Sequence, residues 1–237
     1  MTTKLTWLGA AAFRLVTESG FTIYLDPWLE NTDYPASERE PERVDLIVVS
    51  HGHFDHVGQT MKLWERLHPT VVAPQDVRRW LERQGLDRDD NLGPDMGGTI
   101  EVGEVTISLT DAHHSGGAPD GSYGGAPCGV VLGLPDGNRI YFAGDTCVFG
   151  DMKLIDIMHK PNIALLPIGG HYTMDPTGAA MALSMLSVSK CIPCHYRFGP
   201  QPPPPRAKLL GKPHQLRELV GDKVEIITPA PGETILI

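Results

Sequence analysis

The stretch Leu46-Ile47-Val48-Val49-Ser50-His51-Gly52-His53-Phe54-Asp55-His56 decides the fold class of this 237-residue chain. Its first four residues form an uninterrupted apolar run, which predicts a short strand buried on both faces. Metal-binding side chains follow at once. Because side chains alternate along extended backbone, His51 and His53 can face one metal ion, while Asp55 and His56, at the turn into a helix, can face a second. The stretch therefore predicts a metal site at the end of a buried strand.

Strands and helices are predicted on both sides of this stretch from β-rich runs, turn residues and helix-end residues. The expected strands are 5–8, 13–16, 22–25, 99–102, 105–110, 128–134, 139–143, 163–166, 190–194, 224–227 and 234–237. The expected helices are 58–67, 75–84, about 176–186 and one near 213–220. Some strands pair as hairpins and others alternate with helices. The pattern therefore predicts mixed sheets with helices outside, a layered α/β arrangement.

The composition narrows the function classes. The net charge is −9, which argues against nucleic acid or a membrane surface as the partner, since both require clustered Lys and Arg. No run approaches the length of about eighteen apolar residues needed to span a membrane, and no signal peptide is visible at the N-terminus. The cysteines are too few for a disulfide scaffold; they are Cys128, Cys147, Cys191 and Cys194. A cytoplasmic location is the simplest interpretation.

Four more residues with ligand-type side chains lie beyond the first stretch and offer three further ligand positions. Asp145 and His195 each close an apolar strand, where a side chain can project from a rigid edge. His113 and His114 compete for a third position. Strand alternation places these two on opposite faces, so only one of them is expected to be a ligand.

The order of these motifs resembles the metallo-β-lactamase superfamily, and most closely its small metal-dependent hydrolases related to ascorbate-6-phosphate lactonases. The His-x-His-x-Asp-His run carries the resemblance. The other matching segments include Trp7-Leu8-Gly9, Leu25-Asp26-Pro27-Trp28, Ala112-His113-His114, Ala143-Gly144-Asp145-Thr146, Pro167-Ile168-Gly169-Gly170 and Pro193-Cys194-His195-Tyr196. The resemblance implies a single hydrolase domain over residues 1–237, folded as a four-layer αββα sandwich of two mixed β-sheets flanked by helices.

The resemblance also implies a role for each candidate ligand. The implied ligands are His51, His53 and His114 for the first metal, Asp55, His56 and His195 for the second, and Asp145 as a bridge between both. The expected cofactors are two divalent transition-metal ions, zinc first, with Mn, Fe or Ni as alternatives. Asp26 either orients a ligand histidine or caps the Pro27 turn, and both interpretations stay open.

Three features do not follow the family pattern directly. Many relatives have histidine where this chain has Ala10, so a role for that position is not carried over. His171 replaces the Asn or Asp of relatives and is either a pocket residue or an ordinary loop histidine. Cys191-Ile192-Pro193-Cys194-His195 matches the c-type haem attachment pattern. That interpretation needs export and removes His195 from the metal site, so two buried cysteines or a thiol pair are favoured.

The implied activity is hydrolysis. A two-metal-activated hydroxide would cleave a small ester, lactone or phosphodiester, with Asp55 as the catalytic residue that orients it and passes a proton. The alternative is a nuclease or phosphodiesterase acting on nucleic acid, which the acidic charge and the lack of a basic arm disfavour. A flavin-linked diiron oxidoreductase is disfavoured by the intact ligand run.

The expected partner is a small-molecule substrate, anionic ones included, and assembly into a homo-oligomer is left open. Substrate specificity is expected in segments 115–127 and 196–205. The first of these is rich in glycine and follows His114, so it is expected to be mobile and to cover the pocket.

Overall fold

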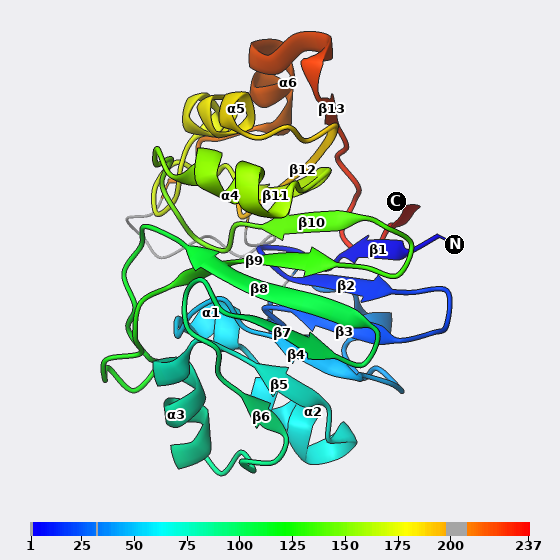
Figure 1. Ribbon diagram of the computed structural model, residues 1–237, viewed down its shortest axis with the longest axis vertical. Helices are drawn as coiled ribbons and strands as arrows, with labels where there is room; N and C mark the ends of the chain where they lie inside the picture. The colour runs from blue at the N-terminus through cyan, green and yellow to red at the C-terminus, as the bar shows by residue number, and fades with distance from the viewer. Residues whose placement is uncertain (1, 32, 198–207) are drawn as a thin grey trace.

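In the computed structural model, which describes residues 2–31, 33–197 and 208–237, two β-sheets of seven strands each lie face to face (Figure 1). The first sheet contains, in spatial order, β14 (Thr234–Leu236), β1 (Lys4–Trp7), β2 (Phe13–Val16), β3 (Thr22–Leu25), β4 (Leu46–Val48), β5 (Thr70–Val72) and β6 (Asn91–Leu92). Neighbours from β14 to β3 are antiparallel, and neighbours from β3 to β6 are parallel. The sheet is therefore mixed, as predicted.

The second sheet is also mixed. Its spatial order is β13 (Glu225–Ile226), β12 (Lys190–Cys194), β11 (Ile163–Pro167), β10 (Arg139–Phe142), β9 (Cys128–Gly133), β8 (Val105–Asp111) and β7 (Thr99–Val102). Neighbours from β13 to β10 are parallel and those from β10 to β7 are antiparallel. Because β8 and β10 both run antiparallel to β9, the carboxyl ends of β8, β10, β11 and β12 lie at one edge of this sheet.

Helices cover the outer face of each sheet. Beside the first sheet lie α1 (Phe54–Val57), α2 (Thr60–Leu67) and α3 (Gln75–Arg83), and beside the second lie α4 (Met152–His159), α5 (Pro176–Met185) and α6 (Pro213–Val220) (Figure 1). Two short 3-10 turns are η1 (Ala36–Glu38) and η2 (Gly221–Lys223). None of the helices in the described part of the chain has the length and apolar character required to cross a membrane.

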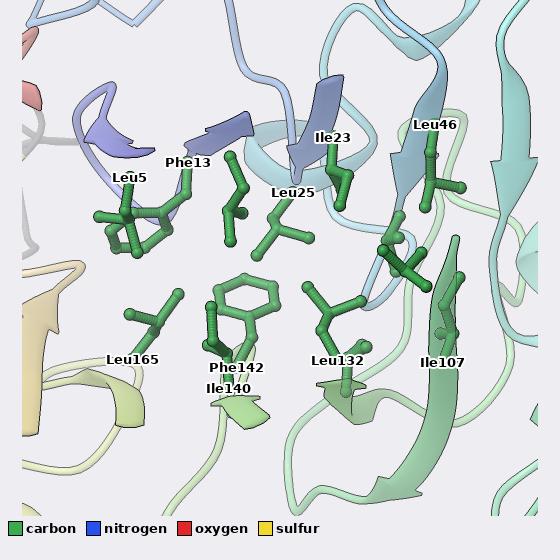
Figure 2. Close-up of a cluster of buried hydrophobic side chains, with 14 of the residues drawn as sticks. Leu5, Phe13, Ile23, Leu25, Leu46, Ile107, Leu132, Ile140, Phe142 and Leu165 are labelled. Atoms are coloured by element: carbon green, nitrogen blue, oxygen red, sulfur yellow. The ribbon is translucent and has the colours of Figure 1, made fainter. Parts of the chain in front are cut away.

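The alternation of side chains along each strand creates the layers. Figure 2 shows one face of each sheet meeting the other in a core of buried hydrophobic side chains. Its labelled residues are Leu5, Phe13, Ile23, Leu25 and Leu46 from the first sheet and Ile107, Leu132, Ile140, Phe142 and Leu165 from the second. The intervening residues point outward. Tyr141 and Leu166 pack with Leu183 of α5, and Ile47 packs in the same cluster as Leu81 of α3. These three cores separate four layers, which confirms the predicted αββα sandwich.

Some elements differ from the sequence-based prediction. The helix expected over 58–67 begins at Thr60, and the separate turn α1 precedes it, because Gly58 has a positive φ of 43° between them. Strands β5 and β6 and helix α4 were not predicted. Most of the proposed specificity segment 196–205, with its proline run Pro202–Pro205, lies outside the described residues.

Candidate metal centre

The seven candidate ligands meet at the carboxyl ends of the strands. His51, His53, Asp55 and His56 follow β4, and His114, Asp145 and His195 follow β8, β10 and β12. Because these strands are fixed within the sheets, the residues that directly follow them start from a rigid edge. The centre therefore draws on both sheets.

The first group of ligand-type atoms contains His51, His53 and His114, whose donor atoms all lie within 4.8 Å of one another. His51 Nε2 and His53 Nδ1 are 3.0 Å apart. His51 is fully buried, while the other two rings are half-buried. The predicted first set is thus brought together, with two of its rings facing the accessible side of the centre.

The second group contains Asp55, His56 and His195, and it meets the same 4.8 Å criterion. Asp55 Oδ2 lies 3.4 Å from His195 Nε2 and 3.8 Å from His56 Nε2. Burial is deeper here, since the exposed fractions are 8%, 0% and 1%. The predicted second set is therefore also brought together.

Asp145 lies between the two groups. Its Oδ2 atom is 3.5 Å from His114 Nε2 in the first group, and 3.4 Å from both His56 Nε2 and His195 Nε2 in the second. The preceding Gly144 has a φ of 57°, and a Cβ there would come within 2.8 Å of the Ser50 side chain. Glycine thus lets the chain turn beneath the histidine loop and present Asp145 to both groups.

The residues present fit a metal centre. Imidazole and carboxylate together are donors that suit zinc and other divalent transition metals. Within the described residues, two buried ligand-type atoms, His56 Nε2 and Asp145 Oδ1, have no hydrogen-bond partner. Buried polar atoms are rarely left in that condition, and a cation held by these residues would pair both atoms.

A buried carboxylate orients the histidine loop from behind. Asp26 Oδ2 is 2.6 Å from His56 Nδ1, and the same carboxylate accepts hydrogen bonds from the Ser50 backbone N–H at 2.7 Å and the Ser50 hydroxyl at 2.6 Å. Ser50 Oγ in turn lies 3.0 Å from His51 Nδ1. Asp26 therefore fixes one ring directly and another through Ser50, which supports the orienting role over the capping one. Ser50 itself was not predicted, although it directly precedes His51.

The two adjacent histidines separate as expected. His114 joins the centre, whereas His113 is exposed, stacks on Phe149 with ring centroids 4.5 Å apart, and lies 3.6 Å from Asp111 through its Nε2 atom. His171 is exposed as well and contacts the ring of Tyr172. A pocket role for His171 stays a prediction.

Ala10 reaches the centre through its backbone. Its carbonyl oxygen accepts hydrogen bonds from the Trp7 indole at 3.0 Å and from the His195 backbone N–H at 2.9 Å. Ala10 and His195 both have positive φ, 46° and 52°, which side-chain-bearing residues rarely adopt. The turn that carries His195 is thus held against the first sheet.

The cysteines contribute no redox pair. Cys191 packs in the core beneath α4–α6, and Cys194 packs in the core between the sheets. Their three-residue spacing places them on opposite faces of β12. Of the two interpretations favoured from the sequence, two buried cysteines is the one that the structure supports.

The segment that follows His114 folds back on itself. A bridge pairs Gly117 with Tyr123, and the Ser115 hydroxyl lies 3.4 Å from His53 Nε2. At its tip, Asp120 accepts a hydrogen bond from the Trp80 indole of α3 at 2.9 Å. The expected cover thus adjoins the centre and is tied to a helix. Its mobility stays a prediction.

The pKa values of the histidines shift downward in the first group and upward in the second, so they divide the histidines as the geometry does. Burial, with repulsion from His56 second, holds the pKa of His51 well below its usual range. Burial also lowers the pKa values of His53 and His114. The first group is therefore uncharged at neutral pH, which is the form that binds metal.

In the second group, the shifts favour the charged forms. Burial would lower the pKa of His56, but three carboxylates raise it well above its usual range; they belong to Asp145, Asp26 and Asp55. The pKa of His195 is also raised, because Asp145 and Asp55 outweigh burial. The pKa values of these two acids are lowered in return by the facing histidines.

A family model described as "Beta-lactamase superfamily domain" matches residues 21–196. The chain belongs to the metallo-β-lactamase superfamily. Within this superfamily, it is 40% identical over 235 residues to a UPF0173 metal-dependent hydrolase of Koribacter versatilis (strain Ellin345), covering 98% of this chain and 97% of that protein. It is 41% identical to a UPF0173 metal-dependent hydrolase of Korarchaeum cryptofilum (strain OPF8), covering 98% of each.

Solved structures agree with this membership. Igni18, described as a novel metallo hydrolase from the hyperthermophilic archaeon Ignicoccus hospitalis KIN4/I, superposes with a TM-score of 0.85 at 30% identity, covering 100% of this chain and 99% of that one. An isothiocyanate hydrolase from Delia radicum gut bacteria superposes with a TM-score of 0.71 at 22% identity, covering 98% of each chain. The second likeness concerns the fold alone.

Proposed function

We propose that this superfamily member is a hydrolase that uses two divalent transition-metal ions to cleave a small ester, lactone or phosphodiester. The coarser part, a metal-dependent hydrolase of the metallo-β-lactamase superfamily, follows from the family membership. Zinc is the metal that we propose first, because the donor set of imidazoles and carboxylates suits it.

The position of Asp145 carries the proposal. One carboxylate oxygen lies within 3.5 Å of histidine nitrogens from both groups. His51, His53 and His114 would hold one ion, and Asp55, His56 and His195 the other. Two ligand groups that share a central carboxylate are the arrangement expected of a two-metal hydrolytic site.

When bound, the ions would supply Lewis-acid polarisation of the scissile bond and a lowered pKa for water. The chain's own residues supply the remainder. The neighbouring histidines keep the pKa of Asp55 low despite its burial, so its carboxylate stays ionised. Its Oδ2 atom is therefore able to accept a proton from the attacking water and to return it to the leaving group. Asp26 keeps the His56 ring in place throughout.

The test combines metal analysis with a substrate panel of esters, lactones and phosphodiesters. Protein purified without added metal is expected to contain about two transition-metal ions per chain. Asp145→Ala should lose or loosen one ion and lose activity on any substrate found. Asp55→Ala should lose more activity than its metal loss explains.

His214→Ala is the matched control, because His214 is an exposed histidine of α6 outside both groups. It should keep the metal content and the activity of the unmodified protein. Folded protein that neither contains nor takes up metal overturns the proposal. Activity that survives Asp145→Ala undiminished overturns its two-metal part.

A further inference from the structure

An arginine-rich pocket lies on helix α3, outside the metal centre. It has a volume of about 570 Å³ and is lined by Arg78, Arg79, Glu82, Arg83, Leu86 and Arg88. We call it the α3 pocket. This volume lies in the range of small-molecule sites. The lining holds four of the chain's twelve arginines, although the net charge of the chain is −9.

The single carboxylate of the lining is already shared. Glu82 accepts a hydrogen bond from Arg78 Nη1 at 2.7 Å, and its Oε1 atom lies 3.8 Å from Arg88 Nε. Arg79 is 3.6 Å from Asp76, but both side chains are largely exposed, so this pair is weak. Within the described residues, Arg83 has no ion pair. The pocket therefore keeps an excess of positive charge.

The acidic residues nearest to the lining in sequence do not neutralise its positive charge by direct contact. Asp87 and Asp89 flank Arg88 and are exposed, and neither forms an ion pair with the lining within the described part of the chain. Asp90 is engaged elsewhere, since it accepts a hydrogen bond from the Trp64 indole at 3.0 Å.

One wall of the pocket is fixed in advance. The Arg78 side chain is only 20% exposed, and its Nε donates to Gln75 Oε1 at 2.9 Å. It passes directly over Gly93, where a Cβ would come within 2.3 Å of Arg78 Cδ. A guanidinium held in this way loses little conformational freedom when it binds a ligand.

Two further residues of the lining carry like charges. Arg79 and Arg83 are four residues apart on α3 and so occupy one helix face, an unfavourable arrangement for two cations. An anion between them would remove the repulsion. Leu86, only 3% exposed, supplies an apolar surface in the same pocket.

We propose that the α3 pocket binds a small molecule carrying a multiply charged phosphate group. Guanidinium groups present paired donors that match phosphate oxygens, and several of them converge here around one space. The proposal does not rest on the metal centre or on the proposed reaction.

The test is calorimetric titration of inorganic pyrophosphate into the metal-loaded protein at low ionic strength. Three proteins are compared: the unmodified chain, Arg79→Gln/Arg83→Gln, and the control Arg39→Gln/Lys62→Gln, which removes two exposed cations elsewhere. Pyrophosphate that contacts the metal centre does so equally in all three, so the difference between the isotherms reports the α3 pocket. The pocket variant is expected to lose affinity by about tenfold or more, and the control to retain it.

Further variants keep the outcome interpretable. Arg83→Lys retains the charge but not the paired donors, and it should fall between the unmodified chain and the pocket variant. If the double variant does not fold, Arg83→Gln alone replaces it, because this residue is exposed and forms no ion pair within the described residues. Identical isotherms for the unmodified and pocket-variant proteins overturn the proposal, as does an equal loss in the control.

Discussion

Asp145 and Asp26 are the two carboxylates that organise the histidines of the centre. Asp145 approaches histidines of both ligand groups, while Asp26 approaches His56 from behind, on the ring nitrogen that faces away from Asp145. One carboxylate thus lies between the two groups of histidines, and the other holds a ring from behind. Their removal should therefore have different consequences.

The adjacent histidines His113 and His114 give the sharpest residue-scale prediction. His114→Ala should remove a direct ligand and lower the metal content, whereas His113→Ala should leave it unchanged, because His113 is exposed and stacks on Phe149. Elemental analysis of both variants in the same buffer measures this. If His113→Ala removes the metal and His114→Ala does not, the ligand is His113, and our assignment is wrong by one position.

Asp26→Asn tests the orienting role. An amide nitrogen in place of the Oδ2 acceptor cannot receive the His56 Nδ1 proton, so the ring loses its fixed orientation. We expect affinity for one metal ion to fall by about 10–100-fold, measured by competition with a chromophoric chelator. Asp136→Asn is the control, since Asp136 Oδ2 likewise accepts two hydrogen bonds, both from Thr3. Equal affinities for the two variants would remove Asp26 from this role.

The sequence indicated that only one of His113 and His114 is a ligand, and the family resemblance favoured His114. The physical reason was wrong, because β8 ends at Asp111 and both histidines lie beyond the strand, where alternation no longer applies. The link from Asp26 through Ser50 to the histidines was predicted only in part: an orienting role for Asp26 was one of two interpretations, and Ser50 was not predicted. Asp26 and Ser50 lie 24 positions apart, and parallel pairing of β3 with β4 brings them together. Local patterns do not specify which strand pairs with which. The α3 pocket was not predicted either, because its lining includes Leu86 and Arg88, which lie beyond the helix and join it only in the folded chain.

At the scale of elements, a hydrogen bond from helix α3 contacts segment 115–127, which follows His114. The Trp80 indole donates a hydrogen bond to Asp120. Hydrogen bonds from the Ser122 hydroxyl and, second, from this indole lower the pKa of the Asp120 carboxyl to about 2. Asp120 is therefore ionised, and accepts this bond, throughout the pH range of ordinary assays.

Trp80→Phe should loosen segment 115–127 without changing the metal content. Backbone amides of this segment should exchange hydrogen several-fold faster, and the KM of any substrate found should change. Trp64→Phe is the matched control, since it removes a similar indole bond, to Asp90, that does not involve the segment. Unchanged exchange and kinetics in Trp80→Phe would show that the tie does not restrain the segment.

The elements that the sequence missed are short or lack end signals. Strand β6 has two residues, and β5 has three, between Pro69 and Pro74. Helix α4 begins without a side-chain cap at Asp151. By contrast, α5 was predicted from Asp175-Pro176, and the Asp175 side chain does accept from the Gly178 N–H at 2.8 Å. Prediction succeeded at α5, where local chemistry defines the helix end. It failed at β5 and β6, which are defined by pairing within the sheet, and at α4, which lacks a capping side chain.

At the scale of the whole molecule, the charge of the centre links metal uptake to pH. Protein freed of metal by a chelator should carry protons on His56 and His195, whose pKa values are raised, and none on His51, His53 and His114, whose pKa values are lowered. Metal must displace the protons of the second group.

Metal binding should therefore release protons near neutral pH, and lowering the pH from about 8 to about 6 should weaken one ion more than the other. Affinity for metal should fall with pH because the pKa values of His56 and His195 are raised. As the pH falls, more of these rings carry a proton, and a protonated ring cannot bind metal. Calorimetry in buffers of different ionisation enthalpy counts the protons. This division between the two groups would be contradicted if both ions were lost together as the pH falls and metal binding released no protons.

The distribution of the ligands along the chain has a consequence for synthesis. His51, His53 and His114 are all present once the first half of the chain has left the ribosome, but His195 arrives only in the last fifth, and its turn then docks on the Ala10 carbonyl near the other end. A nascent chain thus passes through a stage in which these three histidines are present and His195 is not. The group of Asp55, His56 and His195 comes together only after the His195 turn has docked on the Ala10 carbonyl.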